Sequence, residues 1–164
     1  MRTRGRIAVI GVGNEFRRDD GVGWAVLAGL HERPLPPETE LATCDADPGR
    51  LIGLWEGARL AVVVDAAHAH PGRPGRVHRL ELDSGFLDQP PTTSSHGLGL
   101  GEAVELARVL DLLPERLVVY AVEGADSSLG AGLSPAVADA VDPLVATVAD
   151  EIARYRDTAA GRPA

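Results

Sequence analysis

The sequence predicts an α/β fold in which a mostly parallel sheet is covered by helices. Short runs rich in β-branched residues alternate with segments whose apolar residues recur at helical spacing, the pattern of parallel strands joined by helices. The chain has 164 residues, close to the usual size of one domain. Its 45% hydrophobic and 24% charged residues are typical of a globular protein, and its apolar runs are too short to span a membrane. We therefore expect residues 1–164 to form a single domain.

Five segments are expected to form strands: residues 6–11, 39–44, 60–64, 76–82 and 116–121. The first helix should follow Asp20, because small and apolar residues then recur on one side of a helix at positions 22, 25, 26, 29 and 30. The prolines at positions 34, 36 and 37 end it. A short second helix is expected over residues 48–55, with proline in its first turn, where the missing N–H does no harm.

Two further helices complete the predicted fold. Residues 101–110 place an apolar stripe on one face, and the last helix begins with Ser134 as its N-cap and Pro135 behind it. Pro143 should kink or divide that last helix, because proline removes a backbone hydrogen bond and clashes with the preceding turn. The tail over residues 157–164 is expected to be frayed.

Charge and cysteine content limit the partners and the compartment. All 16 basic residues are arginine, and the 24 acidic residues bring the net charge to −8, which disfavours nucleic acid as a partner. The single cysteine, Cys44, can form no intrachain disulfide and no multi-cysteine zinc site. The first six residues lead into a strand and not into the apolar core of a signal peptide, so a cytoplasmic location without membrane attachment is expected.

Acidic residues follow most of the predicted strands. In an open parallel sheet ligands bind at the carboxyl ends of the strands, and there the sequence delivers Asp20, Asp45, Asp65 and Glu123, with His96 in the long 84–97 loop. Such carboxylates repel one another unless a cation neutralises them or some are protonated. The pattern therefore predicts a metal site, and two carboxylates with one histidine suit zinc, nickel or another transition ion.

Several familiar motifs are absent from the sequence. There is no HExxH pair, and the third glycine of a dinucleotide-binding GxGxxG would fall on Phe16. The chain has no lysine, which excludes a P-loop, and it has no GxSxG elbow.

Three segments together resemble the signature of the hydrogenase maturation proteases. They are the stretch from Gly11 to Gly23 (GVGNEFRRDDGVG), the stretch from Val62 to Ala66 (VVVDA) and the stretch from Ser95 to Leu100 (SHGLGL). The resemblance extends in order from about residue 6 to about residue 152. It implies a three-layer fold with a five-stranded twisted sheet flanked by helices on both faces. It also implies an endopeptidase that removes a C-terminal extension from the large-subunit precursor of nickel-iron hydrogenase once nickel has been inserted.

The resemblance also implies roles for individual residues. Asp20, Asp65 and His96 correspond to the metal-contacting residues, and Gly13 and Asn14 shape the loop beside them and contact the substrate. Nickel is then presented by the precursor, although zinc or cadmium could occupy the site in vitro. After the second strand many members of the family have an Asp-Gly-Gly-Thr-like turn, whereas this chain has the sequence CDADPG at positions 44–49. The acidic residue of that turn is therefore present as Asp45, but the two glycines that follow it are missing. Asp45 is interpreted as a catalytic base or a substrate contact.

Structural roles compete with these assignments. Asp19 and Asp20 both precede a helix, where aspartate is a favoured N-cap, and we expect Asp20 to contact the metal and Asp19 to cap the helix. Asp65 taken alone would be interpreted as an acceptor of turn amides. Trp24 is assigned to a surface that meets the precursor. The remaining histidines, His31, His68, His70 and His78, are interpreted as bystanders.

Two mechanisms and two other functions stay open at this point. In the first mechanism the ion takes part in the chemistry, by polarising the scissile carbonyl or by activating a water. In the second the ion only anchors the substrate, and carboxylates activate the water. Asp45 or Asp20 serves as the base in either mechanism. The other functions are a non-catalytic nickel-binding or metallochaperone module and a metal-dependent hydrolase of small molecules.

Overall fold

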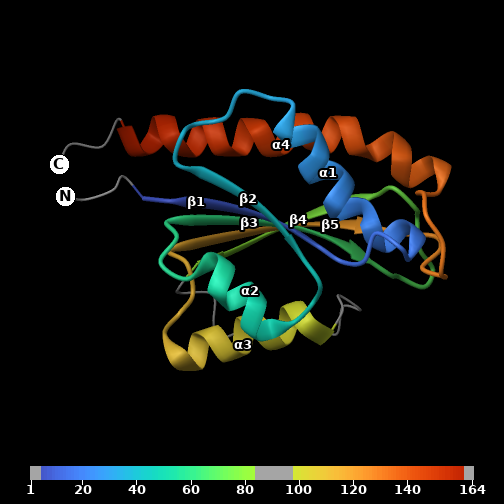
Figure 1. The fold of residues 1–164 in the computed structure, drawn as a ribbon, viewed down its shortest axis with the longest axis horizontal. Helices are drawn as coiled ribbons and strands as arrows, with labels where there is room; N and C mark the ends of the chain where they lie inside the picture. Colours follow the sequence, from blue (N-terminus) through green and yellow to red (C-terminus); the bar gives the residue numbers. More distant parts are fainter. Residues whose placement is uncertain (1–4, 84–97, 161–164) are drawn as a thin grey trace.

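The protein folds into three layers, with a sheet between two pairs of helices (Figure 1). The structure is a computed structural model and describes residues 5–83 and 98–160. Its strands are β1 (Ile7–Val12), β2 (Thr39–Cys44), β3 (Leu60–Ala67), β4 (Val77–Asp83) and β5 (Arg116–Glu123). Its helices are α1 (Val22–His31), α2 (Pro48–Trp55), α3 (Leu98–Leu110) and α4 (Pro135–Ala160), and a short 3-10 turn, η1 (Arg18–Gly21), precedes α1. The expected three-layer α/β fold is therefore confirmed.

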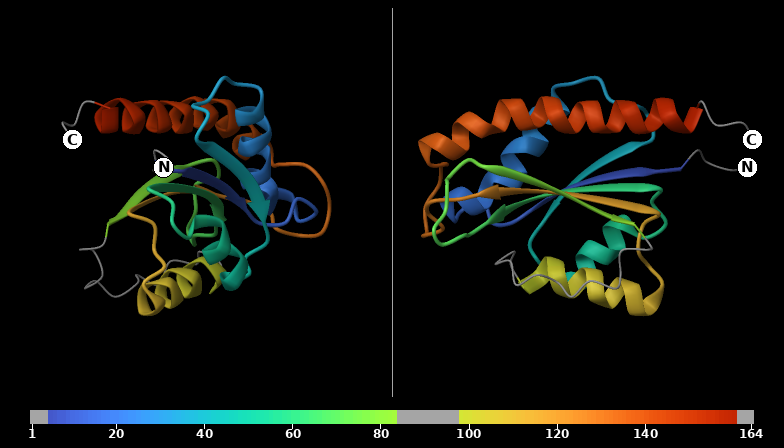
Figure 2. Two further views of the ribbon diagram at one scale, coloured as in Figure 1. Left: turned by 60° about the vertical axis from the view of Figure 1, so that its left-hand side comes forward. Right: turned by 180° about the vertical axis from the view of Figure 1, so that it is seen from behind.

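The sheet has the strand order β2-β1-β3-β5-β4. Four strands run parallel, and β4 pairs with β5 in the antiparallel direction. Figure 2 shows the twist of the sheet, with α1 and α4 on one side and α2 and α3 on the other. The carboxyl ends of the four parallel strands consequently meet at one edge, where a ligand site of this fold class is formed.

Each face of the sheet has its own hydrophobic core, and β3 contributes to both. All eight residues of β3 are buried. Leu60, Val62 and Val64 pack with α1 and α4, whereas Ala61 and Val63 pack with α2 and α3. Because side chains alternate between the faces of a strand, Asp65 extends the second of these rows and points to the side of α2 and α3.

Most predicted elements are confirmed, and the differences lie at their ends. The bounds of β2 and α2 agree with the prediction, β3 continues three residues beyond it, and α3 begins three residues earlier. Pro143 does not divide α4, although the N-terminal part of this helix changes direction in Figure 2. The proline lies on the exposed side of the helix, where the carbonyl that loses its partner can bind water. The helix α4 extends to Ala160, and the frayed tail expected over residues 157–164 stays a prediction.

Two glycines allow α1 to pack directly on the sheet. A Cβ added to Gly23 would lie 2.5 Å from the carbonyl oxygen of Val64, and one added to Gly11 would lie 2.1 Å from a methyl group of Leu27. Neither approach leaves room for a side chain. Gly11 and Gly23 therefore bring the start of α1, and with it Asp20, close to β3.

Candidate active site

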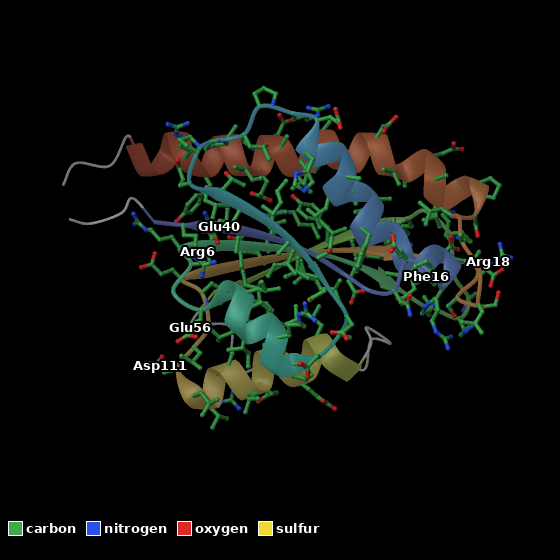
Figure 3. All side chains as sticks on the ribbon, in the orientation of Figure 1. Arg6, Phe16, Arg18, Glu40, Glu56 and Asp111 are labelled. Carbon is green, nitrogen blue, oxygen red and sulfur yellow. The ribbon has the colours of Figure 1, made fainter. Side chains whose placement is uncertain are left out.

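The candidate site lies at the carboxyl edge of the parallel strands. Figure 3 shows this edge at the end where Phe16 and Arg18 are labelled, opposite the end that carries Arg6, Glu40, Glu56 and Asp111. The loop after β1, the turn η1 and the residues that follow β2 all reach this edge. The sequence therefore brings together at one edge the described residues that were predicted to form the site.

A tight loop fixes Asp20 beside Gly13 and Asn14. Gly13 has φ of +136°, and a Cβ added there would lie 2.0 Å from the carbonyl oxygen of Asp20, so only glycine fits this position. The N–H of Asn14 donates to Oδ2 of Asp20 at 2.9 Å, while Oδ1 of Asn14 accepts from the N–H of Phe16 at 2.9 Å. The half-buried Asp20 carboxylate is thus oriented by the loop that precedes it.

Asp65 is a buried carboxyl group with few compensating contacts. It is 5% exposed, and the bond that Oδ1 accepts comes from the N–H of its own neighbour, Ala66, at 2.8 Å. Burial raises the pKa of Asp65 to about 7, the hydrogen bond from Ala66 opposes this, and the charge of Asp20 adds to it. Two neighbouring carboxylates repel each other, so a cation or a shared proton between them is stabilised.

Asp19 has a different role from the one predicted. It is 0% exposed, and its carboxylate accepts four hydrogen bonds: from the N–H groups of Ala125 (2.7 Å), Asp126 (2.9 Å) and Ser134 (2.7 Å), and from the Ser134 hydroxyl (2.7 Å). Burial favours a higher pKa, but these hydrogen bonds lower the pKa of Asp19 below its ordinary value.

The prediction that Asp19 caps α1 is wrong. The N-cap position belongs to Gly21, and no side chain caps the helix. The carboxylate of Asp19 instead joins the loop after β1 to the connection between β5 and α4. The sequence showed two adjacent acids before a helix but not the distant amides that one of them binds.

Three other predicted residues lie at the same edge. Asp45 follows β2, is exposed, and accepts a 3.3 Å hydrogen bond from the N–H of Asp47. Cys44 is buried, and burial, together with the charge of Asp45, raises the pKa of its thiol to about 11, so it is no nucleophile at neutral pH. Trp24 donates from its indole N–H to the Gly13 carbonyl at 3.0 Å, so this residue supports the loop that carries Asp20.

His96 lies outside the described residues, and so does the 84–97 loop. Over residues 5–83 and 98–160, no three His, Cys, Asp or Glu side chains are arranged to hold a metal ion. Asp20 and Asp65 are thus the described members of the predicted set of three, which His96 would complete. In the same ranges, no helix is both long and apolar enough to cross a membrane.

A carboxylate–histidine pair that the sequence did not single out lies further along the edge. Glu123, at the end of β5, is buried, and its Oε2 is 2.7 Å from Nε2 of His78 on β4. The N–H of Arg73, His78 and the nearby Arg76 all lower the pKa of Glu123. The interpretation of His78 as a bystander did not anticipate this contact, because antiparallel pairing of β4 with β5 was not predicted.

Comparisons with known proteins agree with this fold. A family model described as hydrogenase maturation protease matches residues 26–151. A curated hydrogenase 2 maturation protease from Escherichia coli is 25% identical over 147 residues, which cover 87% of this chain and 88% of that protein. The hydrogenase expression/formation protein HupD of Bradyrhizobium diazoefficiens is 27% identical, over 97% of this chain and 84% of that protein.

The solved structures include one of the hydrogenase maturating endopeptidase HybD from Escherichia coli. It superposes with a TM-score of 0.75 at 24% identity, and the alignment covers 93% of each chain. This likeness supports the strand order and the three layers described above.

Proposed function

Because the chain belongs to the hydrogenase maturation protease family, we propose that it is the endopeptidase that removes the C-terminal extension of a nickel-iron hydrogenase large-subunit precursor. The observation that carries the proposal is the pairing of the buried Asp65 with Asp20 at the carboxyl edge of the sheet, in a chain that the family model matches over residues 26–151. Membership of this family favours peptide hydrolysis over a nickel-transfer module or a small-molecule hydrolase.

In this proposal nickel belongs to the substrate. Asp20, Asp65 and His96 would contact the nickel ion that the precursor carries, because two carboxylates and an imidazole are a donor set that transition ions accept. The cost of burying Asp65 as an anion supports this, since a nearby cation offsets it. The metal contact thereby distinguishes a loaded precursor from an empty one.

This chain's residues would also supply the proton acceptor for hydrolysis. A water that attacks the scissile carbonyl needs a carboxylate within hydrogen-bond reach. The exposed Asp45 and the half-buried Asp20 are the candidates, and both lie at the carboxyl edge. Gly13 and Asn14 would form the substrate contact: Asn14 is exposed beside Asp20, and the buried Gly13 shapes the loop there. We also infer that processing takes place in the cytoplasm, where a precursor would be loaded with its metal.

The test is to incubate the protein with nickel-loaded and nickel-free precursor and to weigh the products by mass spectrometry. Loss of a C-terminal peptide from the loaded form alone is expected. Asp45→Asn and Asp20→Asn, measured beside the wild type, identify the base: the variant that still binds loaded precursor but does not cleave it lacks the proton acceptor. Binding of nickel or precursor without any new C-terminus would overturn the proposed activity.

A further inference from the structure

The sheet carries a second group of ionisable side chains on the same face as Asp65. Asp65 on β3 is in register with Ala121 on β5, and Ala121 is paired with His78 on β4. Residues paired across neighbouring strands point to the same face, so Asp65 and His78 lie in one row with only the small Ala121 between them. Two strand spacings separate them, which is about 10 Å.

A buried carboxylate contacts two exposed basic side chains at this place. Oε2 of Glu123 is 2.7 Å from Nε2 of His78 and 4.0 Å from Nε of Arg76. The Glu123 side chain is 5% exposed, whereas those of His78 and Arg76 are 42% and 60% exposed. One buried carboxylate therefore faces two basic side chains that remain open to solvent.

The same face of β4 is left open by the described helices. Leu80, the next residue on this face after His78, pairs with the buried Val119, yet it is 45% exposed. This face of β4 is therefore open to solvent beside His78. An extended chain advances about 3.3 Å per residue, so about 10 Å corresponds to three residues.

We propose that Arg76 and His78 form a subsite for a carboxylate of the precursor, about three residues from the peptide bond that is cleaved. Glu123 is the positioning residue of this subsite, because it fixes both basic side chains, and through the Arg73 N–H (3.0 Å) it also fixes the preceding connection. The inference rests on the proposed function, since that function supplies the peptide and places its cleaved bond at Asp20 and Asp65. In a chain of net charge −8, two exposed basic side chains at the carboxyl edge favour an acidic segment of the precursor.

The experiment compares Arg76→Gln and His78→Gln with the wild type, using nickel-loaded precursor. Arg108→Gln is the matched control, because it removes the same charge from an exposed ion pair on α3. The Kd for the precursor and the KM of cleavage are expected to rise about 2- to 5-fold in the two test variants, with kcat within about twofold, as for a partly exposed charge pair. The control is expected to match the wild type.

A second arm changes the precursor. Each acidic residue within five positions of the cleaved bond is replaced by its amide. One replacement should raise the wild-type KM as much as Arg76→Gln does, and should have no further effect on the Arg76→Gln variant. Unchanged Kd and KM in both test variants, or independent effects of enzyme and precursor changes, would overturn the subsite.

The two proposals fail in different ways. If the wild type binds loaded precursor without cleaving it, the proposed function fails, and the Kd comparison still decides the subsite. If cleavage is normal in every variant at equal KM, only the subsite fails. A wild type that binds no precursor overturns both.

Discussion

Replacing Asp19 by asparagine is expected to destabilise the protein more than the same change at the neighbouring Asp20. Oδ2 of Asp19 accepts three hydrogen bonds, and Oδ1 accepts one from the N–H of Ser134. An asparagine can place its oxygen toward the three donors, but its NH2 group then faces the Ser134 N–H. Hydrogen bonds to charged groups contribute about 1.5–3 kcal/mol and neutral ones about 0.5–1.5 kcal/mol.

These values predict the size of the effect. Asp19→Asn is expected to lower the free energy of unfolding by about 3 kcal/mol. This sum includes one lost hydrogen bond, one donor–donor contact and the loss of charge at the other three bonds. Asp19→Ala removes all four bonds from a buried site and is expected to cost about 5 kcal/mol. In a domain of this size, about 3 kcal/mol corresponds to a decrease in Tm of about 6–12 °C.

The assay combines thermal and urea unfolding with cleavage of loaded precursor at a low temperature. Asp20→Asn is the control: Asp20 is half-buried, and the oxygen of an asparagine can still accept the N–H of Asn14, so its Tm should stay within about 2 °C of the wild type. Cleavage should show the opposite order, with Asp19→Asn active where it is folded and Asp20→Asn inactive. An Asp19→Asn protein as stable as the wild type would refute this account of the buried carboxylate.

Three further predictions follow from the same edge. Asp65→Asn should abolish cleavage, yet without metal it should raise the free energy of unfolding in urea at pH 8 by about 1–3 kcal/mol, with a smaller gain toward pH 4. The folded protein raises the pKa of Asp65 from 3.8 to about 7, so the ionised carboxylate destabilises the fold above the ordinary pKa. An equal effect of the substitution at both pH values would contradict the burial argument. The pKa of Asp19 is lowered instead, so the stabilising effect of its charge should be complete above its ordinary 3.8 and be lost as the pH falls through the lowered pKa of the folded protein. An acid titration of wild type against Asp19→Ala measures this as a difference in Tm that becomes smaller at low pH. His96→Ala should reduce cleavage of loaded precursor at least about tenfold while leaving Tm unchanged, and full activity would remove His96 from the site.

The local elements could be predicted because their signals are local. Proline at the first position of α2 and of α4, and the β-branched run that forms β3, fix the type of element without help from distant residues. The ends were less predictable. β3 passes through Asp65 to Ala67, because β5 continues the hydrogen-bonded ladder beside it.

The parts of the site that depend on distant contacts could not be predicted. From pattern alone Asp19 and Asp20 are equivalent, and only the loop that returns from β5 to Ser134 decides that Asp19 is the buried acceptor. In the same way His78 resembled any surface histidine until antiparallel pairing brought it to Glu123. Charged side chains whose partners lie many residues away give no periodic signal, whereas the Gly13 turn and Asp20 lie within one short loop.

The strand order has a consequence for how the protein is made. The strand β4 precedes β5 in the chain, and β5 is the strand to which it is hydrogen-bonded. The carboxylate of Asp19 likewise accepts hydrogen bonds from residues that come late in the chain, Ala125, Asp126 and Ser134. A nascent chain that ends before Arg116 therefore has an unpaired β4, an open side on β3 and a buried acid without its donors. Synthesis must reach the start of α4 before the loop that carries Asp20 is held in place. The arrangement at the carboxyl edge is therefore completed only after residue 134 has been made, and a chain that ends before this residue lacks the contacts that hold it.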